Sequence, residues 1–571
     1  MVYVLKTNKT LKSGEKVTYL YLAHNIKKQG ITVKEWMVSL GTKTQAEETL
    51  REIALLQKSF NPESAENLSS ALLCAYLEIF NTLELVTTVN GLTSKERSQG
   101  LTPGDYILFC TLNRLTDPTS KNQLKEWFEG TLLKDLYSQC STFLTAQHIW
   151  NHFDEYITPE ILKSIYLSLV KKAITRYGTP FQTLLIDSTN FSTYISDHPF
   201  NELPKKGHGK DGHKHLNLIN ISLLLEKERE FPIYYKTYPG NIPDVTHFKE
   251  LLPELSEWFE QLELETPDLT LVFDKGNNSE DAMKVIEANR WNFIGSLRPS
   301  TFKDLLQEPF TEFSKIYDTK KNHPIYAFRR EAKVYTDTPQ VIIVTFDENV
   351  HDKNLNSLKY HVAKRFDQLR EFTITKLNTK SQWMDPSKIK KHLNEQILKQ
   401  KDFKKIVEII LETTVREAVK FQTLRWGLNE KLFTEKTNPF GKSIIFSNRT
   451  DWSTKDIVLA YRQQFKIEKK FADMKSDKYI QVRPVRHWTD DKIQIHLFIC
   501  VLALLGQALL KLKLKALNVK GSFWKTIKEL ERIHKINLFY NKGRYKKAIL
   551  PHLTQKQSML FSKLNLESYF L

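Results

Sequence analysis

The spacing of apolar and polar positions changes about a third of the way along the chain, from helical periods to strand periods. Near the start, residues 17–22 (VTYLYL) and 31–40 (ITVKEWMVSL) alternate like the two strands of a hairpin. Thr44 and Glu47 then form a capping-box pattern, which predicts a helix to about residue 60.

Residues 66–180 are mainly helical in spacing. Two helix starts are marked by Thr145, which precedes an apolar set at helical intervals, and by Thr158-Pro159, a cap followed by proline in the first helical position. Short helices with short connections suit a helix-turn-helix DNA reader or an ordinary bundle. The pattern alone leaves both interpretations open.

After residue 181 the pattern predicts an α/β fold. It contains five apolar strands separated by helices at about 244–262 and 279–289. The strands are TLLIDST (183–189), HLNLINISLLL (215–225), FPIYYKTYPG (231–240), LTLVFD (269–274) and WNFIGSL (291–297). The order strand, strand, strand, helix, strand, helix, strand is that of an RNase H-like domain, although periodicity alone gives only α/β.

The next stretch interrupts this order. Strand-like pieces at 341–346 and 442–448 flank a charged helical stretch around 385–420, which predicts an insertion. Helices resume at Ser453 and continue through Lys475. The apolar run from His496 to Leu510 has 15 residues, fewer than the ~20 needed to span a bilayer, so it predicts a buried helix.

We therefore expect an α/β protein whose RNase H-like catalytic domain is interrupted by a largely β insertion and preceded by a hairpin and a helical DNA-binding region. The expected boundaries are 1–65 for the hairpin and helix, 66–180 for the helical DNA-binding region, 181–297 and 451–510 for the two parts of the catalytic domain, 298–450 for the insertion, and 511–571 for a basic C-terminal region.

The composition of the chain indicates the kind of partner it binds and the compartment in which it works. Lys and Arg outnumber Asp and Glu by 84 to 66, which gives a net charge of +18 and indicates a polyanion such as nucleic acid, unless the source proteome is simply rich in lysine. Four scattered cysteines exclude a disulfide scaffold and a zinc ribbon and fit a reducing cytoplasm. The N-terminus has no signal-peptide core, and we expect no membrane contact.

Two acids stand where metal-assisted phosphodiester chemistry would need them. Two divalent ions about 4 Å apart can activate a water and stabilise the leaving oxygen, and Mg²⁺ prefers carboxylate oxygens. Asp187 and Asp274 each follow an apolar strand run and precede small polar residues. An acid at a strand end can equally be a helix cap, so each is ambiguous by itself.

A third acid lies in a helical segment with phosphate-binding neighbours. Tyr461, Glu468 and Lys475 are seven residues apart and Gln464 lies four before Glu468, so on one continuous helix all four share a stripe. Arg462 and further lysines add positive charge. A solvated charged helix face is the alternative, but apolar residues along the same segment favour docking on a sheet.

This segment resembles the Tyr-x2-Arg-x3-Glu-x6-Lys signature of bacterial insertion-sequence transposases of the DDE, cut-and-paste group. Tyr461, Glu468 and Lys475 are in register with it, whereas Gln464 stands where that family has arginine, and whether Arg462 takes its place stays open. The resemblance extends over most of the chain. It includes NRLTDPTSKNQLKEWFEGTLL (113–133), IDST, GHGKDGHKHLNLINISLLL, YPGNIPDVTHF (238–248), FDKGNNS and RPVRHWTDDKIQIHLFICVLAL (483–504).

The resemblance implies catalysis and metal binding by Asp187, Asp274 and Glu468, with two Mg²⁺ or Mn²⁺ ions. Tyr461, Lys475, Gln464 and Arg462 would contact DNA phosphates. It further implies cleavage at the ends of a mobile element and joining of the 3′-hydroxyl to target DNA, with a hairpin intermediate in some relatives. Terminal inverted repeats would bind the helical region, and the protein would act as a homodimer on DNA in a prokaryotic cytoplasm, associated with the nucleoid.

Two other interpretations compete with a transposase. One is a catalytically silent, domesticated DNA-binding protein, and the other is a plain RNase H-like nuclease or resolvase. His208, His213 and His215 could bind zinc but lack a fourth ligand, so a basic loop that contacts DNA is preferred. Trp291 and Trp488 could stack on an extruded base, but most aromatics belong in the core and none is assigned.

Overall fold

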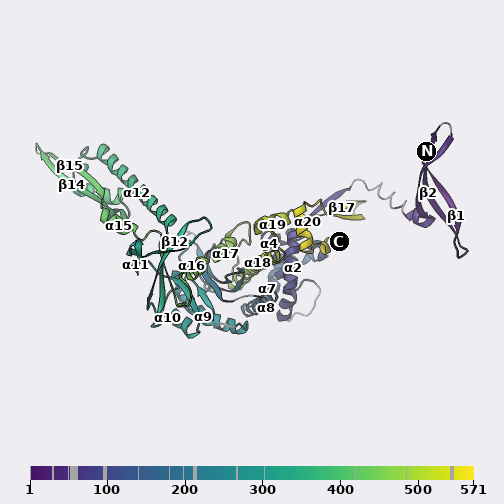
Figure 1. Cartoon of the computed structure of the whole chain (residues 1–571), viewed down its shortest axis with the longest axis horizontal. Helices are drawn as coiled ribbons and strands as arrows, with labels where there is room; N and C mark the ends of the chain where they lie inside the picture. Colours follow the sequence, from purple (N-terminus) through teal and green to yellow (C-terminus); the bar gives the residue numbers. More distant parts are fainter. Residues whose placement is uncertain are drawn as a thin grey trace. The chain divides into compact units, whose positions relative to one another are not determined.

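The structure is a computed structural model. It describes residues 2–28, 31–48, 51, 62–93, 100–138, 140–178, 181–196, 198–209, 215–264, 268–300, 302–417, 419–483, 485–540 and 545–570. These residues form two compact units (Figure 1). The first joins residues 1–75, 125–142 and 517–571, and the second joins 76–124 and 143–516.

The first unit opens with a three-stranded antiparallel sheet, β1 (Val2–Thr10), β2 (Lys16–Lys28) and β3 (Ile31–Thr42). The predicted hairpin is β2–β3, and β1 extends it by a strand that we did not predict. The following helix begins at residue 43, because Thr42 and Gln45, rather than Thr44 and Glu47, exchange the capping hydrogen bonds. Most of its expected length lies outside the described residues.

The rest of the first unit pairs segments that are far apart in sequence. β4 (Ser64–Ser69) and β18 (Tyr545–Ile549) flank β17 (His534–Tyr540) in an antiparallel sheet. Helices α6 (Leu133–Leu136), α19 (Phe523–Glu531) and α20 (Gln555–Lys563) belong to the same unit. The basic C-terminal region is therefore folded into a sheet with residues near position 64.

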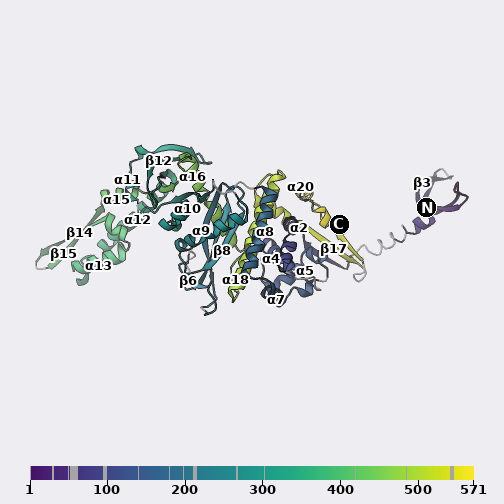
Figure 2. The same cartoon turned by 90° about the horizontal axis from the view of Figure 1, so that it is seen from below.

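The second unit contains a helical layer built on a long apolar helix, α18 (Asp490–Ala516). It packs against α4 (Pro103–Thr116), α7 (Ala146–Tyr156) and α8 (Pro159–Tyr177), as Figure 2 shows. The caps of α7 and α8 are Thr145 and Thr158, as predicted. α18 is long and apolar enough to cross a membrane, yet 94% of its most apolar window is buried within the protein, as in a core helix.

A ten-stranded mixed sheet forms the centre of the second unit. The strands of its first half are β5 (Thr183–Thr193), β7 (Asn217–Glu226), β8 (Pro232–Pro239), β9 (Thr270–Val272) and β10 (Asn292–Ser296), with the short β6 (Lys205–Lys206) beside β7. They lie in the order β8-β7-β5-β9-β10, in which β5, β9 and β10 are parallel and the others antiparallel. This is the predicted RNase H-like arrangement.

The sheet continues beyond residue 297. β16 (Lys442–Ser447) pairs with β10, and β13 (Gln340–Asp347), β12 (Pro324–Ala332) and β11 (Ser314–Asp318) follow it outward. The segment 298–450, expected as a largely β insertion, thus contributes four of its strands to the same sheet. The remainder contains the 28-residue helix α12 (Glu348–Thr375), which lies along the hairpin of β14 (Val407–Arg416) and β15 (Val419–Leu428) (Figure 1).

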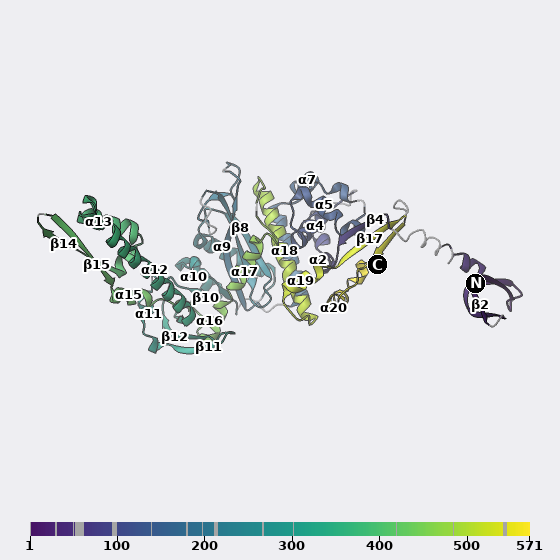
Figure 3. The same ribbon diagram turned by 90° about the horizontal axis from the view of Figure 1, so that it is seen from above.

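Helices lie on both faces of the ten-stranded sheet (Figure 3). Successive side chains of an extended segment point to opposite faces, so neighbouring residues contact different helices. Phe273 points to the face covered by α9 (Asp244–Gln261), where it meets Phe248 with ring centroids 5.1 Å apart. Asp274, the next residue, points to the opposite face, where Tyr461 of α16 (Thr454–Arg462) meets it. α17 (Phe465–Lys475) packs against β5 on that same face.

Candidate active site

Two aspartates lie level with each other on adjacent parallel strands. Leu185 of β5 pairs with Val272 of β9, so Asp187 and Asp274, each two residues further on, occupy matching positions on one face of the sheet. Ile294 of β10 pairs with Val272 in the same register. Ser296 is therefore the third member of this row. Asp187 is half-buried and Asp274 is exposed.

Asp274 is held by two hydroxyl groups. The Ser296 Oγ donates a hydrogen bond of 2.9 Å to Asp274 Oδ1, and the Tyr461 hydroxyl donates one of 3.3 Å to the same oxygen. Ser296 Oγ also accepts a bond of 3.1 Å from the backbone nitrogen of Lys275. These contacts orient the carboxylate while its second oxygen keeps its lone pairs for another partner.

Tyr461 links the second aspartate to the predicted third acid. Burial raises the pKa of Tyr461 above its usual range, and the negative charges of Asp274 and Glu468 raise it further. The phenol therefore stays protonated and acts as a donor. Glu468 is exposed in the first turn of α17, on the side of the sheet that carries Asp187 and Asp274.

The prediction that Tyr461 and Glu468 lie on one continuous helix is wrong. α16 ends at Arg462 and α17 begins at Phe465, with a turn between them. The Gln464 Nε2 donates a hydrogen bond of 3.1 Å to the backbone oxygen of Ile186, the residue before Asp187. This bond fixes the turn against β5. Tyr461 and Glu468 therefore lie on two short helices on the same face of the sheet, and not on one stripe of a single helix.

The expected phosphate contacts have different surroundings in the structure. Gln464 is engaged with the backbone, and Arg462 points to Asp347 at 3.4 Å and lies over the ring of Tyr317 at 5.8 Å. Lys475 lies at the end of α17 with its ammonium 5.8 Å from the ring centre of Phe191 on β5. Of the four, Tyr461 bonds directly to Asp274, and Lys475 lies over Phe191, which shares a face of β5 with Asp187.

Sequence reasoning missed a polar cluster on the other face of the same sheet, formed by residues of β7, β8 and α9. Tyr238 donates a 3.0 Å hydrogen bond to Asp244 Oδ1, and its ring stacks on His247 with centroids 3.5 Å apart. His247 Nε2 lies 2.9 Å from Ser222 Oγ, and burial lowers the pKa of His247 to about 3. The signal was the acid at the start of a helix in the YPGNIPDVTHF segment, which we had quoted only for its resemblance.

The carboxylates of this row are possible ligands for a metal ion. Across the residues that the structure describes, no three histidine, cysteine, aspartate or glutamate side chains are close enough together to hold an ion. The donor chemistry nevertheless suits a hard divalent cation, because two carboxylates lie level on neighbouring strands and α17, which carries Glu468, packs against one of these strands. Of the three histidines considered for zinc, His213 lies outside the described ranges.

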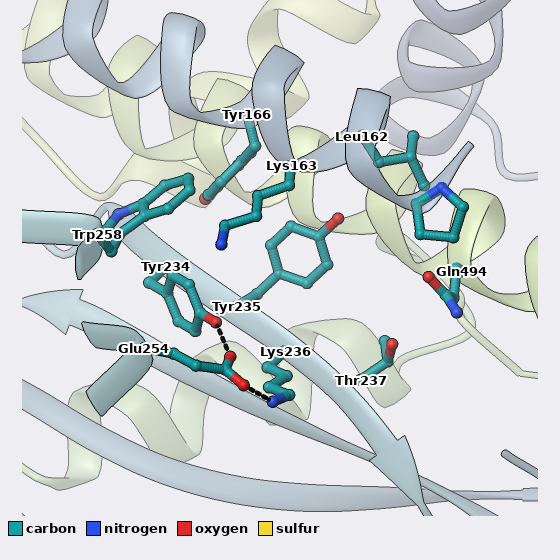
Figure 4. Close-up of a pocket in the computed structure, with 11 residues that line it drawn as sticks. Leu162, Lys163, Tyr166, Tyr234, Tyr235, Lys236, Thr237, Glu254, Trp258 and Gln494 are labelled. Carbon is teal, nitrogen blue, oxygen red and sulfur yellow. Dashed lines mark hydrogen bonds and ion pairs between the residues drawn. The ribbon is translucent and has the colours of Figure 1, made fainter. Parts of the chain in front are cut away.

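A separate hollow of about 220 Å³ lies at the outer edge of β8, between α8, α9 and α18 (Figure 4). The Tyr234 hydroxyl and the Lys236 ammonium both donate hydrogen bonds to Glu254, so these three polar groups of the hollow satisfy one another. Tyr166 donates a 2.7 Å hydrogen bond to the backbone oxygen of Pro232. These side chains cover the edge strand β8, and we assign them no catalytic role.

Comparison with known proteins decides the family. The family described as "Transposase DDE domain" matches residues 178–505, more than half of the chain and the whole of the sheet described above. This chain belongs to the DDE transposase family. A search of curated proteins finds no match.

A comparison with solved structures also finds transposases. A piggyBac transposase synaptic complex with hairpin DNA is 11% identical, with 82% of each chain covered and a TM-score of 0.38. A Mos1 transposase paired-end complex with the left transposon end is also 11% identical, with 35% of this chain and 60% of that chain covered and a TM-score of 0.15.

Proposed function

We propose that this protein is a DNA transposase that cleaves the ends of an insertion sequence and joins the 3′-hydroxyl ends to target DNA. The observation that carries the proposal is the row of Asp187, Asp274 and Ser296 on three adjacent parallel strands, with the Tyr461 hydroxyl bonded to Asp274. Membership of the DDE transposase family supports the same reaction class.

Asp187, Asp274 and Glu468 are the proposed catalytic residues and would hold two Mg²⁺ or Mn²⁺ ions. When bound, such ions activate the attacking oxygen and stabilise the leaving oxygen of a phosphodiester. Ser296 and Tyr461 fix the direction of the Asp274 carboxylate through their hydrogen bonds. Because its pKa is raised, the Tyr461 phenol keeps its proton, and a DNA phosphate would accept that hydrogen bond only in place of Asp274.

Lys475 is proposed to position a phosphate beside the carboxylates, since it lies over Phe191, four residues from Asp187 on the same face of β5. Gln464 is proposed to act through the backbone of Ile186 and not through DNA. Arg462 is paired with Asp347, so its phosphate contact would require that ion pair to open.

Two roles beyond the chemistry belong to the same proposal. The helices of residues 66–180 would bind the terminal inverted repeats, and two chains would act together because two ends must be cut and joined in concert. The net charge of +18 supports a DNA substrate, since each neutralised phosphate releases a condensed counterion.

The test is a cleavage and joining assay on labelled element-end DNA with Mg²⁺. Wild type should yield a 3′-hydroxyl end that joins to a second duplex, and both steps should be lost in Glu468→Gln and in EDTA. Glu435→Gln, an exposed glutamate on α15 (Glu430–Thr437), is the matched control and should retain activity. Cleavage without joining would indicate a plain nuclease. DNA binding without cleavage under every divalent ion would indicate a silent DNA-binding protein.

A further inference from the structure

Two large aromatic side chains are exposed at the far end of the strand that carries Asp187. The side chain of Tyr194, directly after β5, is 76% exposed, and that of Trp488 is 70% exposed. With Ile195, Val485 and Arg486 they line a groove of about 440 Å³. Exposure of two large rings side by side costs solvation free energy, so it calls for a partner that covers them.

Buried polar groups hold the backbone beneath these rings. Thr193 Oγ1 donates a hydrogen bond of 2.7 Å to the backbone oxygen of Val485, and Asn201 Nδ2 donates one of 2.8 Å to the backbone oxygen of Trp488. Asn217 Nδ2 donates a hydrogen bond of 2.9 Å to the backbone oxygen of Ile195. All three donors are at most 5% exposed. Both walls of the groove are therefore fixed from below, and the rings are presented to solvent on a preformed frame.

The groove lies at the end of the strand that carries Asp187. The segment after α17 contacts β5 at two points: the Lys475 ammonium lies 5.8 Å from the ring centre of Phe191, and Val485, which lines the groove, pairs with Thr193. Six residues of strand separate Asp187 from Thr193, which is about 20 Å. A bound strand could therefore reach from the carboxylates to the groove.

The charge along this path is positive. Lys475, Arg483 and Arg486 follow one another from α17 to the groove, and the Arg483 guanidinium meets the backbone oxygen of Lys475 at 3.5 Å. Arg486 is exposed and forms no ion pair with any acid in the described ranges. An aromatic pair beside a guanidinium is the combination that binds unpaired nucleic acid, since every base can stack and every phosphate is anionic.

We propose that the groove of Tyr194, Arg486 and Trp488 binds unpaired bases of a DNA strand whose phosphodiester lies at the carboxylate row. This rests on the proposed function. The rings stack on one or more bases, and Arg486 contacts the adjoining phosphate. The groove thereby captures the single-stranded part of a melted or nicked DNA end and keeps it away from the cleaved phosphate.

The experiment measures binding of Glu468→Gln protein to two probes without divalent ions, so that no cleavage occurs. One probe is a blunt duplex, and the other is the same duplex with a single-stranded oligo-dT tail that carries 2-aminopurine. The parent protein should bind the tailed probe more tightly and change its fluorescence. Adding Tyr194→Ala and Trp488→Ala together should weaken tailed-probe binding about tenfold or more and leave blunt-duplex binding unchanged.

Two variants complete the test. Trp488→Phe should retain most of the tail preference because it keeps a stacking face, and Tyr360→Ala, which removes a ring 65% exposed on α12, should change nothing. Equal binding of both probes by parent and double variant would overturn the inference but not the proposed function. Failure of the parent to bind either probe would count against the proposed function itself. An unchanged blunt-duplex affinity shows that the double variant is folded.

Discussion

At the residue scale, the Asp274 carboxylate is oriented by Ser296, a serine that no motif in the sequence singles out. Ser296 donates to Asp274 and accepts from the backbone of Lys275, so it ties the acid to the strand end. We expect Ser296→Ala to lower the cleavage rate about 10–100-fold, the usual cost of losing a group that orients a metal ligand, with DNA affinity unchanged.

The check on this prediction is single-turnover cleavage at several Mg²⁺ concentrations. A positioning role predicts that excess Mg²⁺ restores part of the lost rate. Ser314→Ala is the control, because the hydroxyl of this serine bonds to the backbone oxygen of Ala327 on an outer strand of the same sheet. If Ser296→Ala cleaves as fast as wild type at all Mg²⁺ concentrations, Ser296 does not orient Asp274.

His247 makes folding sensitive to acid. Burial lowers the pKa of His247 to about 3, whereas in the unfolded chain it is near 6.5. Between these values the unfolded state binds more protons, so His247 lowers stability as pH falls through 6.5 toward 3, by up to about 1.4 kcal/mol per pH unit. Thermal unfolding from pH 7 to pH 4 should show a smaller loss for His247→Asn than for wild type. Parallel curves would contradict the assignment.

At the element scale, the sequence predicted the strands better than the helix beside them. Asp187 and Asp274 each end an apolar run, and local patterning is enough to place such strands in a sheet. The turn between α16 and α17 left no local signal, because Gln463 and Gln464 are ordinary helix formers. It arises from long-range contacts, namely Tyr461 on Asp274 and Gln464 on the Ile186 backbone.

The insertion shows a second limit of local patterning. β13 and β16 were correctly predicted as strands, but nothing in their sequences indicates that β16 pairs with β13, about 100 residues earlier, and with β10, about 150 residues earlier. The C-terminal region was likewise expected only to be basic, and its strand β17 pairs with β4. Partner choice over such distances is set by the whole fold rather than by any window of residues.

The β7–β8 hairpin offers an element-scale test. A methyl group on Gly240, just after β8, would come within 2.0 Å of the backbone oxygen of Leu218 on β7. We expect Gly240→Ala to lower the free energy of unfolding by about 1–3 kcal/mol or more, because backbone must move. Urea unfolding measures this. Gly427→Ala on β15, where nothing lies within 4 Å, is the matched control and should leave the midpoint unchanged.

At the scale of the whole molecule, charge and shape make separable contributions to DNA binding. A net charge of +18 supplies attraction that any DNA sequence shares, and this part weakens as salt rises. Stacking in the groove of Tyr194, Arg486 and Trp488 adds a part that depends on unpaired bases and hardly on salt. The two parts can therefore be assigned to particular side chains by measuring affinity at several salt concentrations.

For the tailed probe, the logarithm of affinity should fall linearly with the logarithm of salt concentration. Arg486→Gln should reduce the slope by about one, because one phosphate contact is lost. Trp488→Ala should lower affinity at every salt concentration and leave the slope unchanged, because a neutral ring releases no counterions. Fluorescence anisotropy between 50 and 300 mM salt resolves these outcomes. If Arg486→Gln left the slope unchanged, Arg486 would not contact a phosphate, and the groove would need an occupant with less charge than DNA.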